Sequence, residues 1–261
     1  MRRIQQFGAL LALSVIACAQ TKVPIEDEPP PSDSDQKAIL DRITQNALKY
    51  SNDLPDFVCN RLTRRSVDPT GFSQSWRTID TVDEELSFTG HKENYKTVSV
   101  NGKSAAGSHR SGSASYEFGD ALSWIFAPNV QADLKWHSWT LVNQRRTQVF
   151  AYSITQPKSQ FFIGASKNKV AASIAGMVYA DAETANVMRV IVIATSPAKF
   201  PITNVTYDLT YDFIKVGGQR LVLPVKSDYH AKDGKSLVWT EVEFRRYRQP
   251  GSDAAGKLET R

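Results

Sequence analysis

The chain has 261 residues and a formal net charge of +5 at pH 7, with 41% hydrophobic and 23% charged residues. This length is sufficient for one domain with a sizeable core. The basic residues form small scattered clusters, such as Arg61/Arg64/Arg65, which are typical of solvated strand faces or protected sheet edges. The lack of a concentrated basic patch argues against nucleic acid as a partner.

The N-terminus resembles a bacterial export signal. Two arginines, Arg2 and Arg3, precede an apolar run over 7–17 that is too short for a membrane span, which needs about 20 residues. The letters "VIAC", ending at Cys18, are typical of lipoproteins whose cysteine receives a lipid, whereas the small residues around Cys18 also allow cleavage after Ala19. We expect a signal peptide over 1–18 with lipid attached at Cys18, and cleavage after Ala19 stays as the alternative.

Residues 19–34 predict a disordered tether. The segment is acidic and rich in proline, so it buries too little apolar surface to offset the entropy of ordering. Bacterial lipoproteins commonly carry such a spacer, which favours lipidation of Cys18. We therefore expect a lipid-anchored protein on the periplasmic side of a bacterial membrane, or a soluble periplasmic or secreted protein if Ala19 is the cleavage site.

Cys59 is the one thiol left in either mature chain. It lies among apolar residues in "DFVCNRL", and no histidine is near it in the sequence to act as a base. The sequence predicts a buried and unreactive side chain.

Two helices are expected in the folded part, over 35–51 and 117–126. In the first, Ile39, Ile43, Ala47 and Tyr50 recur at helical spacing. Between and after the helices run many strands whose turns carry hairpin signals, at Asn101-Gly102, Gly217-Gly218 and Asp233-Gly234. Such short connections imply antiparallel pairing.

The expected fold class is α+β, a single domain over 35–248 followed by a disordered tail over 249–261. Several strands, such as 190–194, are apolar on both faces. A strongly curved antiparallel sheet, a half-barrel with both helices on its concave face, would produce this pattern.

The second half of the chain resembles outer-membrane lipoprotein-sorting (LolA-like) proteins. The matching positions in two strand-turn-strand stretches are Gly176, Val178, Asp181, Thr184, Val187 or Met188, Arg189, Tyr211-Asp212, Gly218, Leu223-Pro224 and Phe244 to Arg248. A closer likeness is to exported bacterial proteins of that type with "LP-x-F-x-C" after the first helix, here from Leu54 to Cys59. The resemblance implies a helix-lidded half-barrel that holds acyl chains in an apolar cavity.

Catalytic and metal-binding signatures are weak. The histidines, His91, His109, His137 and His230, lie far apart and none has the spacing of a zinc site, so no metal or cofactor is expected. The acids Asp80, Asp83, Glu84 and Glu85 fit a solvated strand end better than a calcium loop. We expect a protein that is not an enzyme and assign no catalytic residue, with a hydrolase that uses these acids as one alternative.

Aromatic residues are dense between 116 and 162, which predicts either a large core or a lined apolar cavity. The functional interpretation is a cell-envelope protein that binds an apolar ligand, a lipid or a lipoprotein acyl chain. A structural or partner-binding protein with a filled barrel is the other alternative. The expected lumen residues are Phe118, Trp124, Phe126, Trp136, Trp139, Phe150 and Tyr152.

Overall fold

The structure is a computed structural model that describes residues 25, 28–105, 116–164 and 166–252. The expected signal peptide, including Cys18, and residues 253–261 of the expected tail lie outside the described residues. So does His109.

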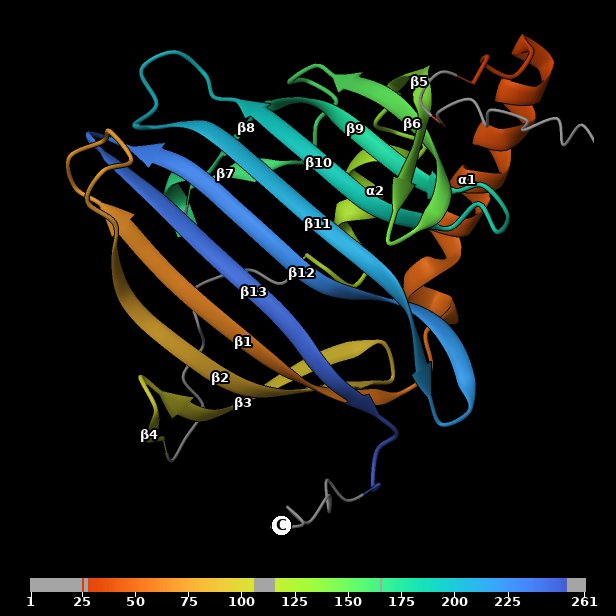
Figure 1. Ribbon diagram of the computed structural model, residues 1–261. Helices are drawn as coiled ribbons and strands as arrows, with labels where there is room; N and C mark the ends of the chain where they lie inside the picture. Colours follow the sequence, from red (N-terminus) through yellow and green to blue (C-terminus); the bar gives the residue numbers. More distant parts are fainter. Residues whose placement is uncertain (1–24, 26–27, 106–115, 165, 253–261) are drawn as a thin grey trace, which may run out of the picture.

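Most of the described chain forms one 11-stranded sheet with the order β4-β3-β2-β1-β13-β12-β11-β10-β9-β6-β5. Every neighbouring pair is antiparallel, and the sheet curves strongly without closing (Figure 1). This confirms the α+β half-barrel expected from the sequence. The strands are β1 (Phe57–Asp68), β2 (Arg77–Thr89), β3 (Lys92–Val100), β4 (Lys103–Ser104), β5 (Asp133–Val142), β6 (Arg145–Ile154), β9 (Ser173–Asp181), β10 (Val187–Thr195), β11 (Ile202–Val216), β12 (Gln219–Asp233) and β13 (Ser236–Arg248).

Two smaller features fill the connection between β6 and β9. A two-stranded sheet pairs β7 (Phe162–Ile163) with β8 (Val170–Ala171), and the 3-10 helix η2 (Ser166–Asn168) lies between them in sequence.

Turn chemistry sets the strand register as expected. Val100 pairs with Lys103 around Asn101-Gly102, whose φ values are 52° and 72°. The partners Val216 and Gln219 likewise flank Gly217-Gly218, at 55° and 88°. Two successive residues with positive φ are typical of two-residue hairpins that match the twist of the strands.

The first helix, α1 (Asp33–Asp53), begins two residues earlier than the sequence predicts. The reason is its cap, because the Ser32 side chain accepts a hydrogen bond from the Asp35 amide at 3.3 Å. Its buried residues are Ile43 and Ala47. Arg42 and Asn46 donate to backbone oxygens of the β9–β10 turn, which holds α1 across one end of the sheet.

The segment before α1 also contacts the sheet. Trp139 on β5 donates its indole hydrogen to the Pro29 carbonyl at 3.1 Å, and Arg146 on β6 pairs with Glu28. This part of the expected tether therefore lies against β5 and β6.

The second helix, α2 (Asp120–Phe126), begins later than the expected residue 117. Gly119 precedes it with φ 133°, outside the helical region, so 117–119 form a turn instead. Most of α2 is buried, including Trp124 and Phe126. It lies on the concave face of the sheet between the strands and α1, where both helices were expected (Figure 1).

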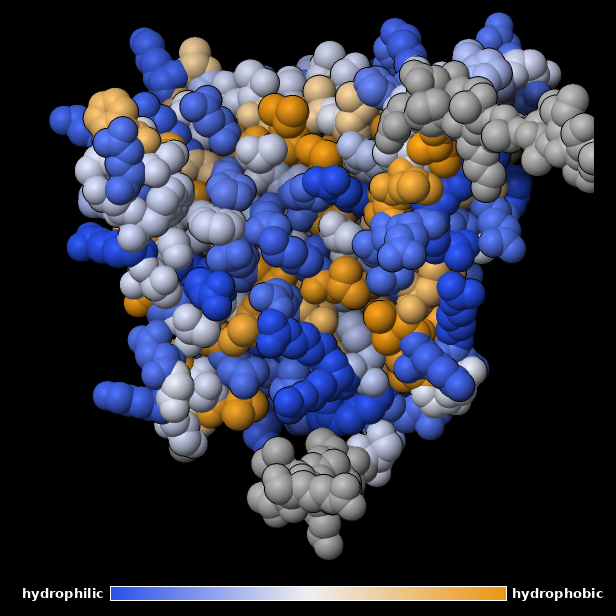
Figure 2. Space-filling model, viewed as in Figure 1, coloured by the Kyte–Doolittle hydropathy of each residue, from blue (hydrophilic) through white to orange (hydrophobic). Residues whose placement is uncertain are grey.

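The concave face carries two hydrophobic clusters. The larger one joins α1 and α2 to β6, β9, β10 and β11, and the smaller one contains Phe57, Leu86, Phe88 and Phe244. The outer face of the sheet is mostly hydrophilic (Figure 2), with ion pairs such as Lys226–Asp228 at 2.9 Å. The sequence predicts that 190–194 are apolar on both faces of the strand. The outer face is exposed to solvent, since Ile193 is 55% exposed.

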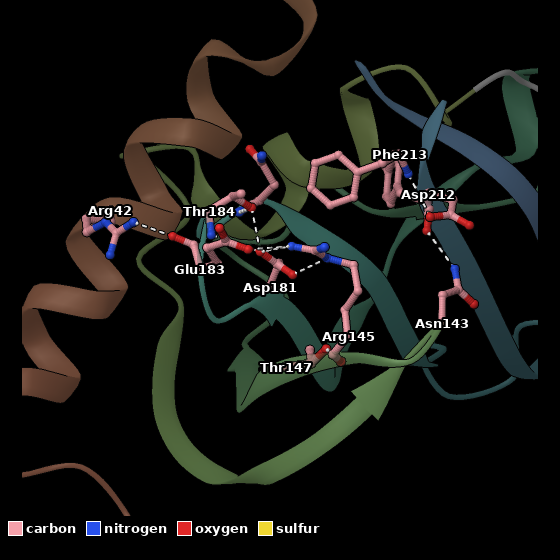
Figure 3. Close-up of polar contacts among 11 residues, drawn as sticks. Arg42, Asn143, Arg145, Thr147, Asp181, Glu183, Thr184, Asp212 and Phe213 are labelled. Atoms are coloured by element: carbon pink, nitrogen blue, oxygen red, sulfur yellow. Dashed lines mark hydrogen bonds and ion pairs between the residues drawn. The ribbon is translucent and has the colours of Figure 1, made fainter. Parts of the chain in front are cut away.

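The resemblance motif around Asp181 forms the β9–β10 turn (Figure 3). Asp181 Oδ1 accepts from both the amide and the hydroxyl of Thr184, each at 2.8 Å. Arg145 Nε donates to Asp181 Oδ2 at 2.6 Å, so β6 is tied to the turn. These contacts confirm that Asp181 and Thr184 shape a hairpin.

Candidate functional site

A cavity of about 250 Å³ lies on the concave face. Its floor comes from β11, β12 and β13, and its roof from Tyr116, Trp124 and the segment 161–164. Arg65 lines the cavity from β1, the strand that follows β13 in the sheet order. The lining residues are Arg65, Tyr116, Trp124, Phe161, Phe162, Ile163, Gly164, Tyr207, Ser227, Tyr229, Thr240 and Val242.

Aromatic rings form most of the wall. Trp124 is the centre of this group, with ring-centroid distances of 4.8 Å to Tyr116, 4.8 Å to Phe161 and 5.9 Å to Tyr207. All three contacts are edge-to-face, the arrangement that aromatic rings prefer. The wall is therefore held by ring packing before any ligand enters.

Strand pairing explains why the floor residues share one face. Tyr207 on β11 is directly opposite Tyr229 on β12, which is opposite Thr240 on β13. Residues that pair across antiparallel strands point to the same side. Ser227 and Val242 form the next paired row on that side.

The hydroxyl groups of the cavity have unequal surroundings. Ser227 donates to Glu117 Oε1 at 3.0 Å. Within the described part of the chain, the buried hydroxyl of Tyr207 has no hydrogen-bond partner. Burial raises the pKa of Tyr207 well above its ordinary value, and burial also raises that of Tyr229 to about 12. Both therefore stay neutral hydroxyls at physiological pH.

Arg65 is the one cation among the lining residues of the cavity. Asp80 holds it with two hydrogen bonds, of which the Nε–Oδ1 bond is 2.7 Å. This hydrogen bonding raises the pKa of Arg65 further, and its side chain remains 34% exposed. The guanidinium therefore combines a fixed position with access to solvent.

Next to the cavity, an ion cluster is buried inside the half-barrel. Arg61 Nη1 donates to Glu84 Oε2 at 2.9 Å, and the two residues are 1% and 0% exposed. The pKa of Arg61 is raised although burial opposes it, because Glu117, Tyr95 and Glu84 favour the charged form. A buried pair of this kind needs such additional partners to offset its desolvation.

The expectation of a solvated strand end at 80–85 is therefore wrong for Glu84, and that of a solvated face is wrong for Arg61. Even-numbered residues of β2 point toward the concave face, so Glu84 is carried inside, as are Val82 and Leu86. Three of the four acids named for the hydrolase alternative pair with arginines: Asp80 with Arg65, Glu84 with Arg61 and Glu85 with Arg248.

Of the expected lumen residues, Trp124 lines the cavity. Phe118 instead packs on Phe57 and Phe244, at 5.3 Å and 5.5 Å between centroids. Trp136 contacts Trp139 and Phe150 at 4.9 Å and 5.4 Å, in a separate aromatic group. Phe126 and Tyr152 belong to the larger hydrophobic cluster. Their assignment to a ligand stays a prediction.

The floor of the cavity was not predicted from the sequence. Tyr207, Tyr229 and Thr240 are more than ten positions apart and show no common motif. Counting back from the hairpin at Asp233-Gly234 would have placed Tyr229 opposite Thr240. The same count from Gly217-Gly218 misses Tyr207 by one residue, because the β11–β12 register shifts between Thr210 and Tyr211.

Cys59 is buried, as expected. Burial raises the pKa of its thiol to about 12, which keeps the thiol protonated at neutral pH. Among the described residues, no group of three or more histidine, cysteine or acidic side chains converges into a site for a metal ion. No helix in that part of the chain is both long and apolar enough to cross a bilayer.

No protein-family model matches the sequence, and no curated protein is significantly similar to it. Solved structures that are similar to the chain include a DUF1329 family protein from Desulfovibrio piger, 9% identical over 84% of this chain and 94% of that one, with a TM-score of 0.38. A LolA superfamily protein from Nitrosomonas europaea is 8% identical over 86% and 97%, with a TM-score of 0.34. An outer membrane lipoprotein-sorting protein domain from Vibrio parahaemolyticus is 10% identical over 84% and 95%, with a TM-score of 0.38. At these identities the similarity concerns the fold alone.

Proposed function

We propose that this chain is a cell-envelope binding protein that holds an apolar group, from a lipid or an acyl chain, in the cavity of its concave face. The observation that carries the proposal is the cavity itself, about 250 Å³ in volume and walled by Tyr116, Trp124, Phe161 and Tyr207. A dry apolar cavity of about 150 Å³ is large enough to bind benzene. The present cavity has room for a ring or for a short segment of acyl chain.

The placement of polar groups suggests how such a ligand lies. Trp124 and Phe161 form an apolar wall, whereas Arg65 and the hydroxyl of Tyr229 belong to the same lining. Apolar pockets commonly use a few polar groups to orient a ligand. A ligand with an apolar body and a polar end would meet both kinds of surface.

The cellular location is part of the proposal and rests on the sequence of residues 1–34. We propose export, lipid attachment at Cys18 and a position on the periplasmic side of a bacterial membrane. Intact mass of the protein from the membrane fraction tests this. A mature chain that begins at Gln20 without acyl mass would show that cleavage follows Ala19 instead.

The binding function is tested by filling the cavity. Thr240→Phe adds a ring to the floor without removing a buried aromatic contact, and aromatic residues suit strands. We expect it to weaken binding of a fluorescent fatty acid at least tenfold while the unfolding midpoint stays close to that of the parent. Thr206→Phe on the outer side of β11 is the matched control. Equal affinity of the parent and Thr240→Phe would contradict the proposal.

One observation favours a second function, a structural or partner-binding protein with a filled half-barrel. Both helices and the aromatic group around Trp136 fill much of the concave face. Lipid mass spectrometry of the purified protein separates the two functions. Stoichiometric acyl species support the binding protein, and their absence together with an ineffective Thr240→Phe supports the filled half-barrel.

A further inference from the structure

One end of the half-barrel forms a rim, made of the segments 69–79, 161–164, 166–169, 196–201 and 232–235. A Cβ atom placed on Gly71 would lie only 2.3 Å from the Lys235 carbonyl oxygen, so the first and last of these segments are in contact. The Gly234 amide donates to the Pro201 carbonyl at 3.1 Å. Phe200 in turn lies beside Gly164, which lines the cavity.

Large apolar side chains are exposed along this rim. Phe72 is 76% exposed, Ile79 58%, Phe162 47% and Trp76 37%. Phe72 lies in the β1–β2 turn, which projects at the upper left of Figure 1. Single exposed apolar residues are normal on a protein surface, but several at one end mark an interaction site.

The same rim is strongly basic. Its segments contain a single carboxylate, Asp233. In the described part of the chain, none of the basic residues of the rim forms an ion pair. One of them, Lys169, lies with its Nζ 4.9 Å from the centre of the exposed Phe162 ring. The basic residues are Arg77, Lys167, Lys169, Lys199, Lys232 and Lys235.

We propose that this rim docks onto the surface of a bilayer that contains anionic phospholipids. Exposed aromatic side chains partition into the boundary between headgroups and acyl chains, and lysines around them pair with anionic headgroups. Both features occur together on the rim, whereas the outer face of the sheet balances its charges in pairs such as Arg189–Asp208. The excess of cations on the rim fits an anionic surface. An apolar side chain on a projecting turn can insert into a bilayer, which a groove cannot do.

The rim also adjoins the cavity. Phe162 is exposed on the rim and lines the cavity, and Gly164 belongs to both as well. A docked molecule would therefore present its cavity next to the bilayer. The docking itself does not depend on a cavity ligand, so it can be tested separately.

The test uses the full chain with Cys18→Ser, which prevents acylation, and measures co-sedimentation with vesicles. We expect stronger binding to vesicles of equal parts phosphatidylcholine and phosphatidylglycerol than to phosphatidylcholine alone. Each cation near an anionic surface contributes about fivefold in affinity, so Lys169→Gln with Lys235→Gln should weaken binding to the anionic vesicles about 25-fold. Lys92→Gln with Lys96→Gln, at exposed positions near the opposite end of the sheet, should have no effect.

The apolar contribution is tested with Phe72→Ser, which we expect to weaken binding about tenfold because an inserted ring is lost. Leu141→Ser is the control, since Leu141 is 54% exposed near the β5–β6 turn, away from the rim. Hydrogen exchange is measured segment by segment, so vesicle binding through the apolar N-terminus does not change the readout at the rim. Anionic vesicles should slow exchange in 69–76 and 161–169.

Several outcomes would overturn the docking proposal. Exchange in 69–76 that is unchanged by anionic vesicles would do so, as would equal binding of Phe72→Ser and Leu141→Ser. Slower exchange with soluble glycerol phosphate alone would show a site for free anions. Slower exchange with polyglutamate but not with vesicles would show a surface for an acidic protein.

Discussion

Asp181→Asn should destabilise the fold much more than the same change in a similar pair on the outer face. The side chain of Asp181 is 1% exposed and accepts hydrogen bonds from Arg145 and Thr184 (Figure 3). Breaking a buried ion pair costs about 3–5 kcal/mol, because the remaining partner stays buried without its counter-charge. Arg145 is 24% exposed and can regain water, which places the expected loss near the lower end, about 3 kcal/mol.

Asp208→Asn is the matched control. Asp208 also binds an arginine through two hydrogen bonds, from Nε and Nη2 of Arg189, but the two side chains are 29% and 36% exposed. Exposed pairs contribute about 0–1 kcal/mol. The two variants therefore share their chemistry and differ in burial.

Urea unfolding of Asp181→Asn and Asp208→Asn measures how much free energy of unfolding each variant loses. A double-mutant cycle with Arg145→Met, and a second one with Arg189→Met, isolates each pairwise energy. We expect a coupling above about 2 kcal/mol for Asp181–Arg145 and below about 1 kcal/mol for Asp208–Arg189. Equal couplings in the two pairs would show that burial does not set the strength of the Asp181 contacts.

Three further experiments test the pH dependence of the Asp181 contacts and two other parts of the structure. Hydrogen bonds from Arg145 and Thr184 outweigh burial and hold the pKa of Asp181 below its ordinary value of 3.8. The contribution of Asp181 to the free energy of unfolding should therefore be present above that pH and be lost as the pH falls further. Asp181→Asn should remove this pH dependence when unfolding is measured in an acid titration. Gly176→Ala would bring a Cβ within 1.8 Å of the Ile191 carbonyl oxygen and should cost about 3 kcal/mol or more in the free energy of unfolding, or prevent pairing of β9 with β10. In a Cys18→Ser background, Cys59 should resist iodoacetamide at pH 8 until urea unfolds the protein, and rapid labelling of the folded chain would contradict its burial.

Local patterns in the sequence were enough to predict the fold class. Hairpin signals such as Gly217-Gly218 depend on backbone conformation at two residues, so they can be recognised without knowing the rest of the chain. The same holds for α1, whose apolar spacing places Ile43 and Ala47 on one face. The boundaries were less accurate because a capping side chain fixes where a helix begins, and the cap at Ser32 starts α1 two residues before the expected position.

The interior could not be assigned in the same way, because side chains that meet there come from distant strands. Trp124 and Trp136 look equivalent in the sequence, yet one contacts Tyr207 of β11 and the other contacts Phe150 of β6. Glu84 was expected in solvent because three other acids surround it. Only its pairing with Arg61 across β1 and β2 shows how a carboxylate can be buried in the half-barrel.

The position of the cavity follows from the length of α2. This helix ends at Phe126, and together with α1 it covers the strands from β6 to β11. Across β12 and β13 the floor of the cavity includes the small or polar residues Ser227 and Thr240, and the roof above them is Tyr116, Trp124 of α2 and the segment 161–164. A short helix leaves this part of the curved sheet under a thin roof, and the cavity lies there. Because that roof continues directly into the exposed rim at Phe162, the cavity lies next to the basic and aromatic surface of the half-barrel.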